Sequence, residues 1–133
     1  MEISVQISVG ELIDKWTILL IKQAKLTDPK AREHVEKELD CINEQVGKVM
    51  RKLNPKNTLE FIDLINLLRD INGKLWGIED DIRKKHNSRT HDQEFIDLAI
   101  AVFTTNQGRS DAKGKINKLC DSFIVEQKQY AGE

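Results

Sequence analysis

Several features that mark other protein classes are scarce in this chain of 133 residues. It has two prolines and only two cysteines, Cys41 and Cys120, which is too few for a disulfide framework or a zinc site. Its 21 Lys and Arg residues are balanced by 22 Asp and Glu residues, and no basic tract is present. This balance argues against a nucleic-acid partner, whose binding surface would carry clustered Lys and Arg.

Long hydrophobic segments are also missing. No apolar run approaches the roughly 20 residues that a helix needs to span a bilayer, so no membrane association is expected. The first residues lack the basic region and apolar core of a signal peptide. We therefore expect a cytoplasmic protein with a single domain over residues 1–133.

What the sequence does contain is helical periodicity bounded by capping signals. Ser8 and Glu11 form a capping box, and Asp28 precedes a proline at a helix start. Thr90 with Gln93 is a further capping signal. We predict four helices, near residues 9–25, 29–52, 58–85 and 92–128.

The third of these segments has the most regular pattern. Its apolar residues are separated by alternating steps of three and four, as in a heptad seam: Phe61, Leu64, Leu68, Ile71, Leu75, Ile78 and Ile82. The apolar pattern of the last segment ends near Tyr130, and Gly108 and Gly114 leave open whether this segment is one helix or two. The fold class predicted is all-α, an antiparallel bundle of four to five helices.

The first seven residues follow a different pattern. Apolar side chains at Ile3, Val5 and Ile7 alternate with polar ones, which predicts a short extended N-terminal arm. An isolated strand leaves its own edge unpaired. We therefore expect a homo-oligomer, a dimer in which two copies pair or exchange their arms.

Polar residues interrupt faces that the periodicity predicts to be buried. Asp14 shares a helix face with Thr17 and Ile18, so it is either paired with a neighbouring helix or faces a cleft. Glu11, one turn earlier, is explained either by the capping box with an ion pair to Lys15 or as part of the same cleft.

The third helix carries a second stripe beside its apolar seam, with Trp76, Glu79 and Arg83 in it and Asp80 one turn beyond Trp76. Trp76 is expected to be mostly buried, as is Trp16, and carboxylates near Trp76 would then border a pocket. The alternative is a solvated acidic face with an ion pair from Glu79 to Arg83.

The fourth helix has an apolar stripe that is interrupted for two turns by Asn106, Arg109 and Lys113. Gln107 and Asp111 project from a neighbouring face. Either a kink at Gly108 exposes these turns, or they line an internal polar cavity.

Together these residues suggest a metal–phosphate site. Convergent carboxylates and an amide are hard oxygen ligands for Mg²⁺ or Mn²⁺, and the candidates are Asp14, Glu79, Asp80, Asn106 and Asp111. Cations suited to a small phosphorylated ligand are Arg83, Arg109 and Lys113. Residues expected to line the pocket are Glu11, Trp76 and Gln107. No catalytic residue is assigned.

Three segments carry a resemblance to known sequences: Val9–Lys15, Leu75–Arg83 and Thr105–Arg109. They resemble a family of small bacterial helical proteins known only as a domain of unknown function, and the resemblance covers nearly the whole chain. The last two segments also resemble a second uncharacterised helical family, which has Leu-Trp-x-x-Glu-Asp and Asn-Gln-x-Arg-x-Asp patterns.

A looser similarity is to the all-α nucleoside triphosphate pyrophosphohydrolases. These enzymes hold Mg²⁺ with acidic pairs at three-residue spacing, and Glu11 with Asp14 has that spacing. The third helix departs from the family pattern, because its acidic residues are consecutive from Glu79 to Asp81.

Two functional hypotheses follow. In the first, the chain is a non-catalytic binding or assembly module whose polar residues form a network across three helices. In the alternative, it is a Mg²⁺-dependent pyrophosphohydrolase of a nucleotide phosphoanhydride. The sequence leaves open whether the protein is an enzyme.

Overall fold

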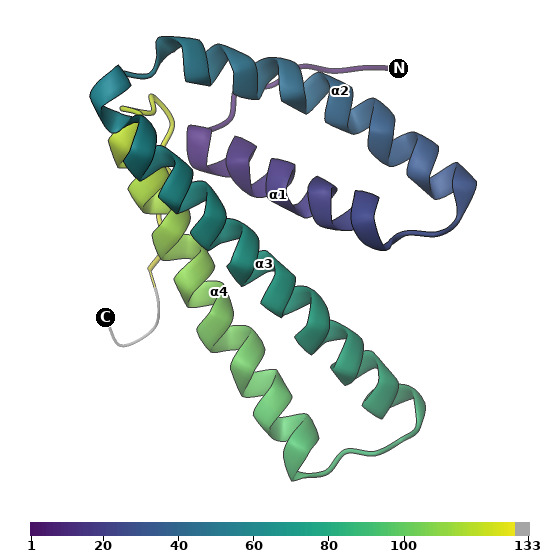
Figure 1. The fold of residues 1–133 in the computed structure, drawn as a ribbon. Helices are drawn as coiled ribbons and strands as arrows, with labels where there is room; N and C mark the ends of the chain where they lie inside the picture. Colours follow the sequence, from purple (N-terminus) through teal and green to yellow (C-terminus); the bar gives the residue numbers. More distant parts are fainter. Residues whose placement is uncertain (130–133) are drawn as a thin grey trace.

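The computed structural model describes residues 1–129, and its regular structure is entirely helical (Figure 1). These residues form no strand, so the predicted all-α class is confirmed. The elements are α1 (Val9–Lys25), α2 (Pro29–Lys52), the short 3₁₀ helix η1 (Pro55–Asn57), α3 (Thr58–Asn87) and α4 (Gln93–Leu119).

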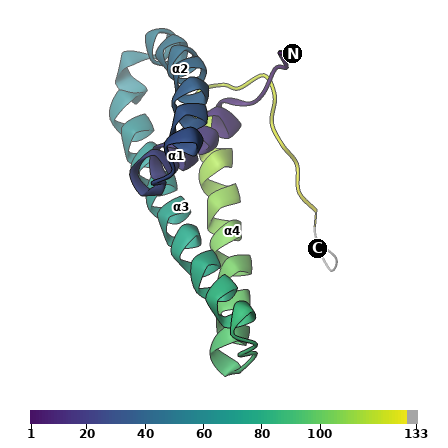
Figure 2. The same cartoon turned by 90° about the vertical axis from the view of Figure 1, so that its right-hand side faces the viewer.

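The helices are arranged as two hairpins that diverge from one end (Figures 1 and 2). The α1–α2 hairpin lies across one end of the longer α3–α4 hairpin, with α1 in contact with both α3 and α4. The far half of the α3–α4 hairpin extends beyond the α1–α2 hairpin. We call this part the distal hairpin, residues 75–105.

Local capping explains where the helices begin. The Ser8 hydroxyl oxygen accepts from the backbone N–H of Glu11 at 3.0 Å, and the Asp28 carboxylate caps α2 in the same way at 2.9 Å. Asp92, and not Thr90 as predicted, caps α4. An ionised carboxylate also complements the positive end of the helix dipole, which favours Asp92 over the threonine.

The main hydrophobic core lies where α1 crosses the α3–α4 hairpin. Its buried residues come from all four helices: Leu12, Ile13, Val46, Phe61, Leu64, Leu68, Ala112 and Ile116. The predicted seam of α3 is buried at five of its seven positions, and Ile71 and Ile82 are half-buried. Trp16 and Trp76 are covered over most of their surface, as predicted, although neither is fully buried. Trp16 keeps its indole N–H near solvent, where it donates to Asn43.

The end of α4 differs from the prediction. The helix continues unbroken through Gly108 and Gly114 but ends at Leu119 and not near residue 128. Asp121 takes a left-handed conformation with φ 50°, and the N–H of Ser122 donates to the carbonyl of Asn117 at 2.8 Å. This pattern is a Schellman motif, which terminates a helix. Tyr130 lies outside the described residues.

Among residues 1–129, no helix has the length and apolar character needed to cross a membrane.

Candidate functional site, a charge network between three helices

The centre of the polar network is an ion pair between α1 and α4. The Asp14 side chain is 1% exposed, and Arg109 donates to it through both arms of its guanidinium. The Nε–Oδ1 distance is 2.9 Å and the NH2–Oδ2 distance is 2.5 Å. This two-point geometry is the strong form of an Arg–carboxylate pair. The structural salt bridge considered for Asp14 is therefore present.

The third helix joins the pair through Asn72, which is 5% exposed. Its Nδ2 donates to Asp14 Oδ1 and to the Thr17 hydroxyl oxygen, each at 2.9 Å. The Thr17 hydroxyl in turn donates to the backbone carbonyl of Asp14 at 2.9 Å. Every oxygen of the buried carboxylate thus has a partner from α3 or α4, which is the condition for burying a charge.

These partners decide the ionisation state of the Asp14 carboxyl. Burial raises its pKa, but hydrogen bonds from Arg109 and Asn72 and the positive charges of Arg109 and Lys113 outweigh burial and hold the pKa below its ordinary value. The same pair raises the pKa of Arg109, chiefly through its hydrogen bonds to Asp14. Both groups are therefore charged at neutral pH.

A second ion pair lies one turn closer to the start of α1. Lys113 Nζ contacts Glu11 Oε2 at 2.6 Å, with the two side chains 19% and 33% exposed. Glu11 therefore takes part in the Ser8 cap through its backbone N–H alone. Its carboxylate, which the predicted capping box would turn back towards Ser8, pairs with Lys113 of α4, where the sequence had suggested Lys15. Two ion pairs therefore connect α1 to α4: Asp14–Arg109 and Glu11–Lys113.

The two helices are in close contact at Gly10. A Cβ atom there would lie 2.5 Å from the backbone oxygen of Lys113 and 2.8 Å from Asn117 Oδ1. Only glycine fits this contact. The Gly10 N–H donates to Asn117 Oδ1 at 2.6 Å, so the tight approach also satisfies a free amide at the start of α1.

The segment after α4 completes this end of the site. Glu126 accepts from the Ser8 hydroxyl and, at 2.9 Å, from Asn117 Nδ2, while Ser122 accepts from the N–H of Val9 at 3.2 Å. Burial raises the pKa of the Glu126 carboxyl, but these hydrogen bonds, Ser8 first, bring it below its ordinary value. The start of α1 is thus held by the chain that follows α4.

Other residues singled out in the sequence lie outside this network. Asp80 pairs with Arg83 at 3.0 Å on a surface where their side chains are 46% and 60% exposed. Gln107 donates to Asp111 at 3.3 Å, also at the surface. Glu79 is exposed and acts on Arg109 only through its charge.

Two further candidates lie between the network and the surface. The half-buried Asn106 accepts from Arg109 NH1 at the long distance of 3.5 Å. Trp76 is half-buried one turn of α3 beyond Asn72. The structure therefore brings Glu11, Asp14, Asn106, Arg109 and Lys113 together and leaves Glu79, Asp80, Arg83, Gln107 and Asp111 apart from them.

Within the described residues, no three Asp, Glu, His or Cys side chains are grouped closely enough to hold one metal ion. Both Asp14 carboxylate oxygens already accept hydrogen bonds from Arg109 or Asn72. The lone pairs used in these bonds are therefore not available to a metal ion. Chemically, the network joins helices through neutralised charges. The Mg²⁺–phosphate site stays a prediction. The arrangement of these side chains does not favour it.

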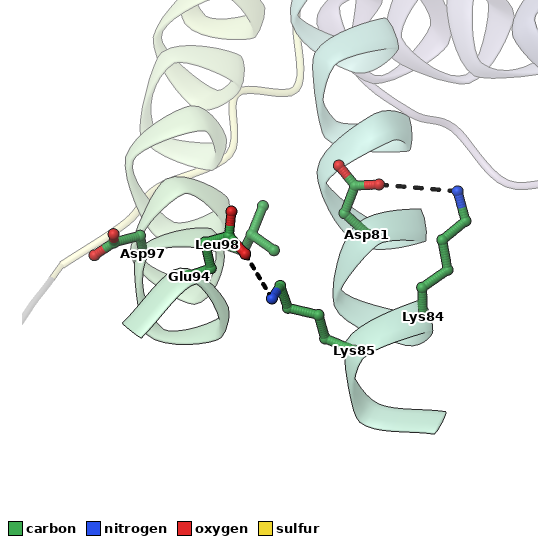
Figure 3. Close-up of a pocket in the computed structure, with 6 residues that line it drawn as sticks. All are labelled: Asp81, Lys84, Lys85, Glu94, Asp97 and Leu98. Atoms are coloured by element: carbon green, nitrogen blue, oxygen red, sulfur yellow. Dashed lines mark ion pairs between the residues drawn. The ribbon is translucent and has the colours of Figure 1, made fainter. Parts of the chain in front are cut away.

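A separate hollow of about 490 Å³ opens between the end of α3 and the start of α4 (Figure 3). Four of its five charged side chains pair with one another, and the fifth, Asp97, accepts a hydrogen bond from Gln93. Lys85 contacts Glu94 at 2.7 Å, and Lys84 contacts Asp81 at 3.9 Å. The hydrogen bonds that Lys85 donates to Glu94 and Asp92 raise the pKa of its ammonium group. The pairing closes the tip of the hairpin and leaves no uncompensated charge among these four lining residues.

Sequence reasoning did not select Asn72, Asn117 or Glu126, although all three make central contacts. Asn72 was visible as a member of the polar stripe on α3, and Asn117 as an amide directly beside the buried Ile116. Glu126 had no such signal: the sequence placed it in the predicted helix 92–128, whereas it lies in the segment after α4.

Comparison with known proteins agrees with the resemblance found in the sequence. A model described as a family of unknown function, DUF6165, matches residues 3–133, so the chain belongs to this family. No curated protein matches the chain. No solved structure matches it either.

Proposed function

We propose that the protein is a non-catalytic assembly module that forms a homodimer through its N-terminal arm, residues 1–7. The observation that carries the proposal is the exposure of the arm. Ile3, Val5 and Ile7 are 83%, 75% and 40% exposed, although all three are β-branched apolar residues in an extended chain. Such residues pack well on a paired strand, whereas their exposure to water is unfavourable.

The base of the arm is rigidly held. Ser8 is 1% exposed and is bound to Glu126, while the next two backbone amides donate to Ser122 and Asn117. The arm therefore leaves the body from a fixed point and projects away from the helices (Figure 2). A fixed direction lowers the entropy that association would otherwise cost.

Pairing with a second copy is more favourable for the arm than exposure to solvent. Two arms paired edge to edge would exchange backbone hydrogen bonds and stack their alternating apolar side chains. Phe123 and Val125, in the segment after α4, are 95% and 49% exposed and offer further apolar surface beside the base of the arm. The charge network supports this role structurally, because it fixes α1 against α4.

Sedimentation velocity over a concentration series tests the proposal. We expect the unchanged protein to dimerise at tens of micromolar and Val5→Asp to weaken the dimer roughly tenfold or more, as loss of an interface anchor does. Gln6→Asp is the matched control, because it adds the same charge to the alternate face of the arm. A monomer at all concentrations, or equal effects of the two substitutions, would contradict the proposal.

The Mg²⁺-dependent hydrolase is tested separately. The proposal predicts that Mg²⁺ does not change the melting temperature, because Asp14 is already neutralised by Arg109. A rise that saturates with Mg²⁺, together with phosphate or pyrophosphate release from nucleotides, would support the enzyme hypothesis instead.

A further inference from the structure

We infer that His86 and His91 form a two-imidazole site for a divalent transition metal of the class of Zn²⁺ and Cu²⁺. His86 lies in the last turn of α3 and His91 in the connection to α4. This connection closes the far end of the distal hairpin (Figure 1). The inference goes beyond the proposed dimer and does not depend on it, because it uses no residue of the arm.

The two ring nitrogens already lie at the separation that one metal ion requires. His86 Nδ1 and His91 Nε2 are 3.2 Å apart and share a hydrogen bond. Zinc binds imidazole nitrogen at about 2.0–2.1 Å, so two such nitrogens are separated by about 3.3 Å at a tetrahedral angle and by about 2.9 Å at a right angle. The observed distance lies between these two values. A small rotation of the rings therefore suffices to place one metal ion between the two nitrogens.

The exchange of a hydrogen bond for a metal ion needs no net loss of a proton. In the metal-free pair, one ring donates its N–H to the lone pair of the other ring. Metal binding requires a lone pair on both of these nitrogens. The shared proton therefore moves to the other nitrogen of its own ring. This change of tautomer is open to both histidines, because both are exposed to water.

Hydrogen bonds fix the backbone between the two histidines. α3 ends in a Schellman motif, in which the N–H of Thr90 donates to the carbonyl of Lys85 at 2.8 Å and the N–H of Arg89 donates to that of His86 at 3.0 Å. Arg89 has the left-handed conformation that this motif requires, with φ 55°. Asp92 then caps α4. The positions of both ligands are thus set before a metal binds, which lowers the entropic cost of binding.

The neighbouring side chains orient the pair and reduce the positive charge beside it. The ring of His91 packs edge-on against Phe95 with 4.8 Å between the ring centroids, which restricts its rotation. Lys85 precedes His86 in the chain, and its ammonium group contacts Asp92 at 3.0 Å and Glu94 at 2.7 Å. These two carboxylates offset the charge that would otherwise oppose a cation at the site.

The ligand set decides which metals bind. Imidazole nitrogen suits Zn²⁺, Cu²⁺ and Ni²⁺, whereas Mg²⁺ prefers oxygen ligands. The site needs no cysteine, so the scarcity of cysteine does not bear on it. Among the described residues no third Asp, Glu, His or Cys side chain joins the pair, so water fills the remaining coordination positions. We therefore expect reversible binding, weaker than that of a closed four-ligand zinc site and tighter for Cu²⁺ than for Zn²⁺.

Isothermal titration calorimetry with Zn²⁺, on protein without an affinity tag, tests the site. The protein carries Cys41→Ser, because the exposed thiol could also take up zinc. We expect one ion per chain and no competition from Mg²⁺. His86→Gln and His91→Gln should each weaken binding roughly tenfold or more. Both residues are exposed, so neither substitution removes a core contact.

His34→Gln is the matched control. His34 is the third histidine of the chain and is exposed on α2, in the other hairpin. This substitution should leave the affinity for zinc unchanged. A loss as large as that of His86→Gln would show that zinc binds scattered surface histidines and would overturn the site. The site is also overturned if millimolar Zn²⁺ does not bind, or if His86→Gln and His91→Gln bind it as tightly as the unchanged histidines do.

NMR spectra that correlate the ring protons with the ring nitrogens test the geometry. Zn²⁺ should shift the resonances of His86 Nδ1 and His91 Nε2 together and leave those of His34 in place. Equal shifts at all three histidines, or shifts at the opposite nitrogens of the pair, would contradict the arrangement inferred from the 3.2 Å contact.

Discussion

Replacing Arg109 with Met should reveal how strongly the network depends on its cation. The substitution removes the guanidinium that binds Asp14 through two hydrogen bonds but keeps a long side chain in its place. The Asp14 carboxylate, 1% exposed, would then face a thioether and retain only the hydrogen bond from Asn72. An unpaired buried charge is the most expensive outcome of breaking such a pair.

The expected loss can be bounded from the burial of the two partners. Removing one partner of a buried ion pair lowers the free energy of unfolding by about 3–5 kcal/mol. Because the Arg109 side chain is 31% exposed, water can reach the vacated space and reduce the penalty. We therefore expect a loss of about 3 kcal/mol at neutral pH, which is a large part of the roughly 5–15 kcal/mol that stabilises a typical domain.

The loss should depend on pH with a definite sign. In the unchanged protein the pKa of Asp14 is below its ordinary value, so its stabilising contribution is present at neutral pH and is lost only as pH falls through that lowered pKa. Without Arg109, burial raises the pKa of Asp14 above its unfolded-state value. Acidification towards about pH 4 then protonates the carboxyl and removes the penalty, so the difference between the two proteins shrinks.

Urea unfolding followed by circular dichroism at several pH values measures this difference. Arg83→Met is the matched control, because it breaks an exposed ion pair with Asp80, for which a change of about 0–1 kcal/mol is typical. Arg109→Met destabilising the protein by less than about 1 kcal/mol, or equally at all pH values, would show that Asp14 is not held by its pairing with Arg109.

Four further predictions concern packing and thiol chemistry. Gly10→Ala should destabilise the protein by about 1–3 kcal/mol, because its Cβ would meet a backbone oxygen of α4 at 2.5 Å. Gly73→Ala, whose Cβ meets nothing within 4 Å, should instead stabilise α3 by about 0.5–1 kcal/mol in the same urea assay. Leu68→Ala should cost about 2–5 kcal/mol, and a loss below about 1 kcal/mol would remove this residue from the core. Iodoacetamide, followed by mass spectrometry, should modify the exposed Cys41 before Cys120, since burial raises the pKa of Cys120 to about 11 and only the thiolate reacts; equal rates would contradict the burial.

The boundaries that the sequence predicted well are those set by local chemistry. α1 and α2 begin where Ser8 and Asp28 can cap free amides, and both starts agree with the prediction. The end of α4 was placed too late because Ile116, Cys120 and Phe123 continue an apolar period. Periodicity contains no signal for a Schellman turn formed by an aspartate, and Phe123 is 95% exposed once the helix has ended.

The candidate site was predicted in part for a related reason. Asp14 and Arg109 were both identified as polar residues on apolar faces, and they form the central pair. Glu79 and Asp80 were grouped with them because they lie on the same stripe of α3. A stripe gives the face of a helix but not the point along it where another helix crosses. α1 contacts α3 at Asn72, so the acidic residues two turns further along lie at the surface.

The same limit explains the exposed apolar residues of α4. From Leu98 to Phe103 every residue is apolar, so no period distinguishes an inner face from an outer one. The fold of one chain buries only the face towards α3 and α1, and Ile100 and Phe103 remain 56% and 65% exposed. Scattered exposed apolar residues need no explanation, but a continuous exposed stripe on one helix does. The excess apolar character of this segment over what one chain can cover is therefore the strongest physical reason to measure the association state of the protein.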